Sequence, residues 1–338
     1  MKNLLWIASL GIAIAGLLFP IAGRAAAQPV AVTTYHYDTL RTGWNSSETT
    51  LTATNFPSNF GILQTVTLDD QVDAQPLIIP GLTIAGGTHD VVYVATESNT
   101  VYAIDASSGA ILLSRNLGAP VPAPLGCNNN GPNVGINGTP VIDPVSQTLY
   151  VVAYVNGSPP IYQLHALSLS TLADAPSSPV TVTASHTLTN GSTYTFNASY
   201  QRQRPALLLN DNIVYAAFGS FCDYDGQYSR GWLLGWNAST LAPLAGNQLV
   251  DRQATAPDGF FLSSIWMSGW GVAASGDHLY VVTGNSDPGT YDGVTNIQES
   301  VVRLNEDLTL AGVYTPSNVK TLDQYDVDLG SGGVLLLP

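Results

Sequence analysis

Four side chains of the sequence have the types and spacing of a small-molecule binding site: Asp73, Arg202, Arg204 and Trp270. Charged residues make up only 10% of the chain, so two arginines separated by one residue are conspicuous. A planar guanidinium group forms forked hydrogen bonds to a carboxylate. If the chain has a small-molecule site, we therefore expect the two arginines to bind an anionic ligand there, with Asp73 and Trp270 nearby. The favoured alternative is structural: an internal ion pair in which Asp73 neutralises the arginines, or arginines that lie at solvated ends of the channel.

The rest of the sequence contains no recognisable catalytic or metal motif, and we predict neither kind of site. Cys222-Asp-Tyr-Asp225-Gly226 lacks the third acidic residue and the distal glutamate of a calcium loop, which favours a turn. No serine lies in a Gly-x-Ser-x-Gly elbow, and no paired carboxylates support polymer hydrolysis. The histidines lack the close pairing of a zinc site: His36, His89, His165, His186 and His278.

The segments that position these side chains recur along the chain. A Pro or Gly followed by apolar residues appears five times, at spacings of 64, 65, 66 and 62: Pro76, Pro140, Pro205, Gly271 and Gly333. Alternating apolar segments follow each of the first four, which is typical of β-strands. Short antiparallel strands that recur in this way predict an all-β fold, a β-propeller. Its inner strands are expected near residues 72–78, 136–142, 201–209, 267–274 and 329–337.

Innermost strands line the axis of a propeller, so residues just before the anchors should face one another there. One predicted row is Asp73, Asn137, Arg202, Ser268 and Gly330, and the other is Gln75, Thr139, Arg204, Trp270 and Gly332.

The propeller is predicted to extend over residues 28–338, with four blades of about 64 residues and the first strand of a fifth. A lone apolar strand would expose an unpaired edge, which natural proteins avoid. We therefore expect a partial propeller. A closed four-bladed ring that the fifth strand completes is the alternative.

The first 27 residues have the layout of a signal peptide: Lys2, an apolar stretch over residues 4–19, and small residues before Gln28. The stretch is short for a membrane anchor, which needs about 20 residues. Export to the periplasm or the exterior is therefore expected, with no later membrane span. In that compartment Cys127 and Cys222 are predicted to form a disulfide. Six sequons would be glycosylated only in a eukaryotic source: Asn45, Asn137, Asn156, Asn190, Asn197 and Asn237.

The charge balance limits the partners. There are 24 acidic residues against 10 basic ones, and binding to a phosphate backbone requires clustered cations. Nucleic acids and anionic membrane surfaces are therefore excluded, which leaves a protein or a small molecule as the expected ligand.

Several segments resemble secreted bacterial β-propellers of the pyrroloquinoline-quinone-like repeat class, also called quinoprotein alcohol dehydrogenase-like. They include residues 35–52, 73–77, 89–97, 101–109, 219–223, 231–232, 265–269, 283–285 and 328–333. The resemblance covers nearly all of residues 33–338. It implies a propeller fold. For the enzymes of the class it also implies a quinone on a tryptophan floor, a calcium ion held by carboxylate and amide oxygens, and an adjacent-cysteine disulfide.

The sequence departs from the enzymes of this class. Its two cysteines are far apart, and Leu113 stands where the repeat motif would end in tryptophan. Trp266 and Trp270 are candidates for the floor, although large aromatic residues more commonly pack between blades. We therefore expect a non-catalytic binding or scaffold module without cofactor. The alternative is an alcohol or sugar dehydrogenase that depends on pyrroloquinoline quinone and calcium.

Overall fold

The computed structural model describes residues 30–123, 125, 131–188, 191–221, 230–246, 263–285 and 297–337. The predicted signal peptide and both cysteines, Cys127 and Cys222, lie outside these ranges. Signal cleavage and the disulfide therefore stay predictions.

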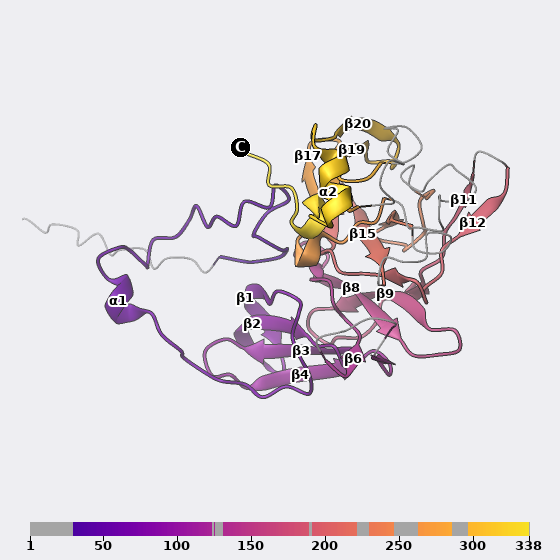
Figure 1. The fold of residues 1–338 in the computed structure, drawn as a ribbon. Coiled ribbons are helices and arrows are strands. Elements are labelled where there is room, and N and C mark those ends of the chain that lie inside the picture. The colour runs from indigo at the N-terminus through magenta and orange to yellow at the C-terminus, as the bar shows by residue number, and fades with distance from the viewer. Residues whose placement is uncertain are drawn as a thin grey trace, which may run out of the picture.

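Four four-stranded antiparallel sheets follow one another along the chain (Figure 1). The first contains β1 (Leu77–Ile84), β2 (Gly87–Ala95), β3 (Thr100–Asp105) and β4 (Ile111–Asn116). The second contains β7 (Val141–Asp143), β8 (Thr148–Val155), β9 (Ile161–Ser168) and β10 (Val180–Thr181). The third contains β13 (Gln201–Arg202), β14 (Leu208–Asn210), β15 (Ile213–Ser220) and β16 (Trp232–Asn237). The fourth contains β17 (Ala273–Ser275), β18 (His278–Val282), β19 (Val301–Asn305) and β20 (Leu310–Tyr314).

The remaining elements are short. Two hairpins join β5 (Val121–Pro122) to β6 (Asn133–Val134), and β11 (Ser185–Thr187) to β12 (Thr193–Thr195). The helices are α1 (Phe56–Asn59), α2 (Val319–Tyr325) and the 3-10 turns Met267–Gly269 and Leu329–Ser331. Consecutive four-stranded antiparallel sheets are the blades of a β-propeller, and the predicted fold class is confirmed. Within the described ranges no helix combines the length and apolar character needed to cross a membrane.

Neighbouring sheets pack face to face, which explains why their central strands are buried on both sides. The six inner residues of β8 are all buried, and apolar clusters join the first sheet to the second, the second to the third, and the third to the fourth. A tyrosine hydroxyl on β2, β8 and β15 donates to the carbonyl of the residue that follows β9, β16 and β19, respectively, in the next unit. The pairs are Tyr93 to Leu169, Tyr150 to Ala238 and Tyr215 to Glu306, at 2.6, 3.0 and 3.0 Å.

Hydrogen bonds near the inner strands join residues 64 positions apart. The backbone N–H of Gln75 donates to Thr139 Oγ1 at 2.8 Å. The N–H of Ala206 donates to the carbonyl of Trp270 at 2.8 Å, and the indole N–H of Trp270 donates to the carbonyl of Val334 at 3.1 Å. These separations match the spacing of the sequence anchors. Equivalent positions of successive units therefore lie next to one another.

An N-terminal strap, residues 32–43, crosses the inner strands and ties the sheets together. It is the indigo segment that reaches the centre of the molecule in Figure 1. Its backbone bonds the first strands of the first, second and fourth sheets at 2.8 Å: Val32 to Ile78, Thr33 to Ile142, and Thr39 to Ala274. The strap therefore contacts sheets that are distant in the sequence.

Arg41 of the strap reaches the third and fourth sheets. Its guanidinium group is fully buried and donates to the carbonyls of Leu207 and Val272, to the hydroxyl of Thr34 and to the carbonyl of Tyr35. Burial lowers its pKa to about 10, so the group stays charged at neutral pH. Its hydrogen bonds to carbonyl oxygens compensate for lost hydration.

The predicted fifth inner strand near residues 329–337 is absent. The segment instead contains the 3-10 turn Leu329–Ser331, and residues 332–337 form no strand. Close packing explains the difference, because a Cβ atom on Gly333 would lie only 1.8 Å from Cδ1 of Trp270. The segment is packed against the fourth sheet by its glycines and does not pair as a strand.

Candidate functional site

A network of charged and amide side chains joins the first three sheets beside their inner strands. Nε of Arg202, in β13, donates to Oδ1 of Asn137 at 3.0 Å. The amide of Asn137 donates to Oδ2 of Asp73 at 3.2 Å, and the amide of Gln71 donates to Oδ1 of Asp73 at 2.5 Å. Three members of one predicted row, Asp73, Asn137 and Arg202, are therefore brought together by hydrogen bonds.

Glu97 belongs to the same network. It follows β2, is only 2% exposed, and accepts hydrogen bonds from the N–H of Gly135 at 2.7 Å and from the amide of Asn137. Burial, with a smaller contribution from the nearby Asp73, raises the pKa of Glu97 to about 7, while the N–H of Gly135 and the charge of Arg202 act in the opposite direction. We call Asp73, Glu97, Asn137 and Arg202 the Arg202 cluster.

The guanidinium group of Arg202 is held in place by two contacts. Asn137 accepts from Nε, and the ring of Phe221 lies 5.6 Å from the guanidinium carbon. Within the described ranges the two terminal nitrogens form no hydrogen bond to protein, and Arg202 forms no ion pair. An ordered guanidinium group with open terminal nitrogens is suited to a forked contact with a carboxylate.

The other two predicted site residues have different surroundings. Arg204 is partly exposed, and the intervening Gln203 is buried and donates to the carbonyl of Pro205 at 2.5 Å. Trp270 packs against the strap: its ring makes edge contacts with His36 at 4.6 Å and with Tyr35 at 5.8 Å. These contacts place Trp270 in an aromatic group with the strap.

A second group of polar side chains lies where the fourth sheet meets the C-terminal segment. Glu299 is fully buried, and one of its oxygens accepts from the N–H of Leu329 at 2.6 Å. The amide of Asn285 donates to Asp326 at 2.7 Å. Burial, with smaller contributions from neighbouring aspartates, raises the pKa of Glu299 to about 7 and that of Asp328 to about 6. We call Asn285, Glu299, Asp326 and Asp328 the acidic cluster.

Within the described ranges, three buried oxygens of the acidic cluster have no hydrogen-bond donor: Oδ1 of Asn285, Oε1 of Glu299 and Oδ1 of Asp328. A buried acceptor without a donor costs about 1–3 kcal/mol. In the described part of the chain no arginine or lysine forms an ion pair with these carboxylates. Carboxylate and amide oxygens are the ligands that calcium prefers.

The acidic side chains alone are too few for a metal site. Among the residues that the structure describes, no three or more His, Cys, Asp or Glu side chains converge to hold an ion. The amide oxygen of Asn285 would therefore be needed as an additional ligand.

Sequence reasoning did not single out Glu97 or Glu299. Both lie near strand ends: Glu97 follows the end of β2 by two residues, and Glu299 precedes β19 by two residues. An acidic residue near the end of a predicted strand, in a chain with few charged residues, is the sequence feature that could have identified these two glutamates as candidate site residues. Burial of the carboxylate, which makes the position unusual, depends on contacts with distant segments.

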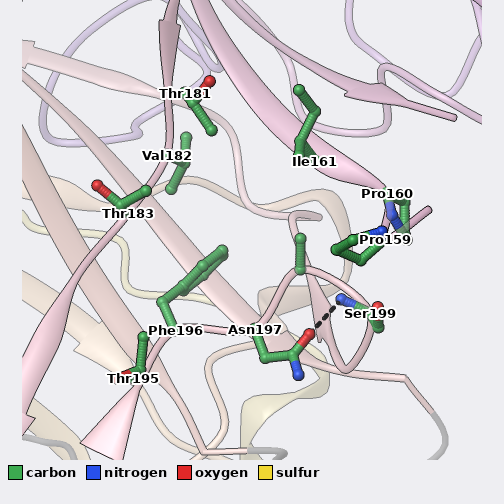
Figure 2. Close-up of a pocket in the computed structure, with 11 residues that line it drawn as sticks. Pro159, Pro160, Ile161, Thr181, Val182, Thr183, Thr195, Phe196, Asn197 and Ser199 are labelled. Carbon is green, nitrogen blue, oxygen red and sulfur yellow. Dashed lines mark hydrogen bonds between the residues drawn. The ribbon is translucent and has the colours of Figure 1, made fainter. Parts of the chain in front are cut away.

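A separate pocket of about 380 Å³ lies beside β9, β10 and β12 (Figure 2). Phe196, Val182 and Ile161 line it together with hydroxyl and amide side chains such as Thr181 and Asn197. None of its lining residues is ionisable. The pocket therefore offers apolar contacts and neutral hydrogen bonds but no acid–base chemistry.

Comparison with known proteins gives similarity in fold only. No protein-family model matches the sequence, and no curated protein does. A quinohemoprotein alcohol dehydrogenase from Pseudomonas putida is 17% identical, with 74% of this chain and 34% of that chain aligned at a TM-score of 0.46. A europium-containing methanol dehydrogenase is 16% identical, with 75% and 42% aligned at a TM-score of 0.45.

BamB from Moraxella catarrhalis is also similar, at 16% identity and a TM-score of 0.32, with 74% of this chain and 75% of BamB aligned. The chain spans less than half the length of the two dehydrogenases. The β-propeller fold itself is established by the four sheets, and the chemistry must be argued from the residues.

Proposed function

We propose that this chain is part of an exported β-propeller that acts as a non-catalytic binding module, and that its ligand presents a carboxylate group to Arg202. The proposal rests on the guanidinium group, which Asn137 and Phe221 hold in place while its terminal nitrogens form no bond within the described residues. The predicted signal peptide supports export. The carboxylate would belong to a small molecule or to a protein partner.

The neighbouring carboxyl groups make this binding depend on pH. Glu97 has a pKa of about 7, so it is largely neutral in mildly acidic solution and negatively charged in mildly alkaline solution. A carboxylate ligand at Arg202 is repelled by a charged Glu97 and not by a neutral one. Affinity should therefore increase as the pH falls from 8 to 6.

The test is calorimetric titration with acetate, succinate, citrate and a short peptide with a free C-terminus. Arg202→Lys keeps the positive charge but removes the fork, and should weaken binding about tenfold. Arg303→Lys, on the exposed part of β19, is the matched control and should change nothing. Absence of binding by all four probes, or equal affinity in Arg202→Lys, would contradict the proposal.

The acidic cluster favours a second candidate function, the binding of a calcium-like cation. The enzymes that the sequence resembles hold calcium with carboxylate and amide oxygens. The unpartnered oxygens of Asn285, Glu299 and Asp328 fit that kind of ion. A bound cation would supply the positive charge that these buried oxygens lack.

The quinone fits the described residues less well. The ring of Trp270 is packed against Gly333 and His36, so residues of the protein occupy positions beside the ring where a quinone would have to stack. Leu113 stands at the position where the class has tryptophan. The dehydrogenase alternative is tested by reconstitution with pyrroloquinoline quinone and calcium, followed by dye-linked oxidation of alcohols and sugars. Turnover by the wild type that is lost in Trp270→Ala would show that the protein is a dehydrogenase and would contradict the proposal of a non-catalytic binding module.

Cation binding is tested separately by titrating calcium into metal-free protein and following the melting temperature. The temperature should rise in the wild type and stay constant in Asp328→Asn, which removes one charged oxygen ligand. Asp143→Asn, at the end of β7, is the control and should respond like the wild type. A calcium response that survives in Asp328→Asn would exclude this cluster.

A further inference from the structure

A cavity of about 530 Å³ lies between the N-terminal strap and the first sheet, apart from both clusters. The strap contributes Val32, His36, Tyr37 and Thr42 to its lining, and the start of the first sheet contributes Gln75 and Ile78. Pockets of roughly 300–1,000 Å³ are typical of small-molecule sites. The cavity therefore has a suitable size for a ligand of one or two rings.

The imidazole of His36 is held rigidly at this cavity. It stacks on Tyr35 at 4.0 Å with an interplanar angle of 12°, and it meets Trp270 edge-on at 4.6 Å. Its backbone N–H donates to the side-chain oxygen of Gln75 at 3.3 Å. A ring with contacts on several sides loses little further freedom when a ligand binds.

The backbone at this point is strained. His36 and Tyr37 are consecutive non-glycine residues in the left-handed region, at φ 54° and 68°. Such residues cost of order 1 kcal/mol or more each and concentrate at ligand-binding sites. Both strained residues, with an imidazole and a phenol, line the cavity.

One nitrogen of the ring is committed to the protein and the other is open. Nδ1 of His36 lies 3.4 Å from the carbonyl oxygen of Arg41. A carbonyl only accepts, so Nδ1 carries the proton, and in the neutral ring Nε2 is an acceptor. Within the described ranges Nε2 has no hydrogen-bond partner. It needs a donor such as a hydroxyl group.

The rest of the lining fits a neutral partner. No Asp, Glu, Lys or Arg side chain lines the cavity. The amide nitrogen of Gln75 has only a 3.5 Å contact, to the carbonyl of Thr34. This nitrogen can therefore donate a hydrogen bond to a ligand. Val32, Pro76 and Ile78 supply apolar surface for C–H groups. Neutral donors and acceptors beside apolar surface suit a molecule that alternates hydroxyl and C–H groups.

We propose that this cavity binds a neutral polyhydroxylated small molecule, a sugar or polyol of one or two rings. A ligand hydroxyl donates to Nε2 of His36, a second oxygen accepts from the amide of Gln75, and the Tyr37 phenol borders the open side. The site is independent of the Arg202 cluster, so either site can be present without the other.

The test is saturation-transfer NMR on the full chain with maltose, cellobiose and sorbitol as probes. At least one probe should receive saturation, and its dissociation constant should rise about fivefold to tenfold in Gln75→Leu and in His36→Phe, the loss of one neutral hydrogen bond. His36→Phe keeps an aromatic ring against Tyr35 and Trp270. Gln64→Leu, an exposed glutamine elsewhere, and Arg202→Lys should bind like the wild type.

Two results would overturn the proposal: no saturation of any of the three probes, or unchanged dissociation constants in both site variants. Circular dichroism establishes that each variant is folded. Should His36→Phe fail to fold, Gln75→Leu and Tyr37→Ala decide the question, because both side chains lie at the edge of the cavity. Glucuronate and glucosamine serve as charged analogues and should bind no more tightly than the neutral probes.

Discussion

The Arg202 cluster and the acidic cluster each bury a glutamate, Glu97 or Glu299, with a pKa of about 7. They differ in how the negative charge is compensated. Glu97 accepts two hydrogen bonds and lies near Arg202. One oxygen of Glu299 has no donor among the described residues, and its charged neighbours there are aspartates.

This difference indicates what each cluster still needs. The Arg202 cluster contains its own cation, whose open terminal nitrogens we propose to bind an anion. The acidic cluster has an excess of negative oxygens, which we propose to bind a proton or a cation. The two proposed sites therefore have opposite preferences.

The largest expected effect concerns both glutamates together. A pKa raised from 4.5 to about 7 means that the folded state holds the proton more tightly than the unfolded state. Stability is then greatest below pH 4.5 as far as these groups are concerned, and it falls as the pH rises to about 7. Each glutamate should contribute up to about 3 kcal/mol to this loss. Urea unfolding of metal-free protein at pH 5 and pH 8 measures it.

Single variants measure how much each cluster contributes to the loss of stability between pH 5 and pH 8. Glu97→Gln and Glu299→Gln should each reduce the pH dependence by about half. Calcium should restore stability at pH 8 in Glu97→Gln and not in Glu299→Gln, because only the acidic cluster is expected to take the ion. Restoration in both variants would show that the two clusters do not differ in the proposed way.

An intermediate effect is expected when the cation of the Arg202 cluster is removed. Arg202→Met keeps the apolar stem beside Phe221 but leaves Asp73 and Glu97 without a nearby positive charge. It should lower the free energy of unfolding by about 2 kcal/mol at pH 8, and by less at pH 6, where Glu97 takes up a proton. Equal losses at both pH values would mean that packing, and not charge, explains the result.

The smallest effect is expected from two matched charge removals. Asp326→Asn keeps an oxygen for the amide of Asn285 and reduces repulsion in the acidic cluster, so metal-free protein should gain about 0.5 kcal/mol at pH 8. Asp73→Asn removes repulsion on Glu97 but also attraction for Arg202, and should be nearly neutral. Urea unfolding of both variants with a chelator present compares them. If Asp73→Asn raised the free energy of unfolding as much as Asp326→Asn, the two clusters would not differ in how their negative charge is compensated.

The sequence predicts the strands and one row of the site because both depend on local alternation and regular spacing. Positions 64 or 65 residues apart, Asp73, Asn137 and Arg202, are linked by hydrogen bonds in the structure. Spacing alone could not show that Glu97 enters the same network, since its burial depends on Gly135 of another unit.

The other differences between the sequence-based predictions and the structure arise from contacts between distant segments, which the alternation of apolar residues within a strand does not reveal. The segment at residues 329–337 is apolar enough for a strand, but its glycines let Trp270 pack directly on it. Trp270 itself is drawn to the strap by two rings from a segment far away in sequence. The strap has no regular secondary structure over most of its length, so alternation could not reveal where it lies.

The strap also has a consequence for the order of folding. Arg41 bonds the carbonyl of Val272 across 231 residues of sequence, and it bonds Leu207 across 166. Contacts of such long range form late, because closing large loops costs entropy before any contact is gained. During synthesis the strap is made before the strands that it contacts. The strap is therefore expected to stay unfolded until the third and fourth sheets have formed. Packing of Arg41 between these sheets should be among the last steps of folding.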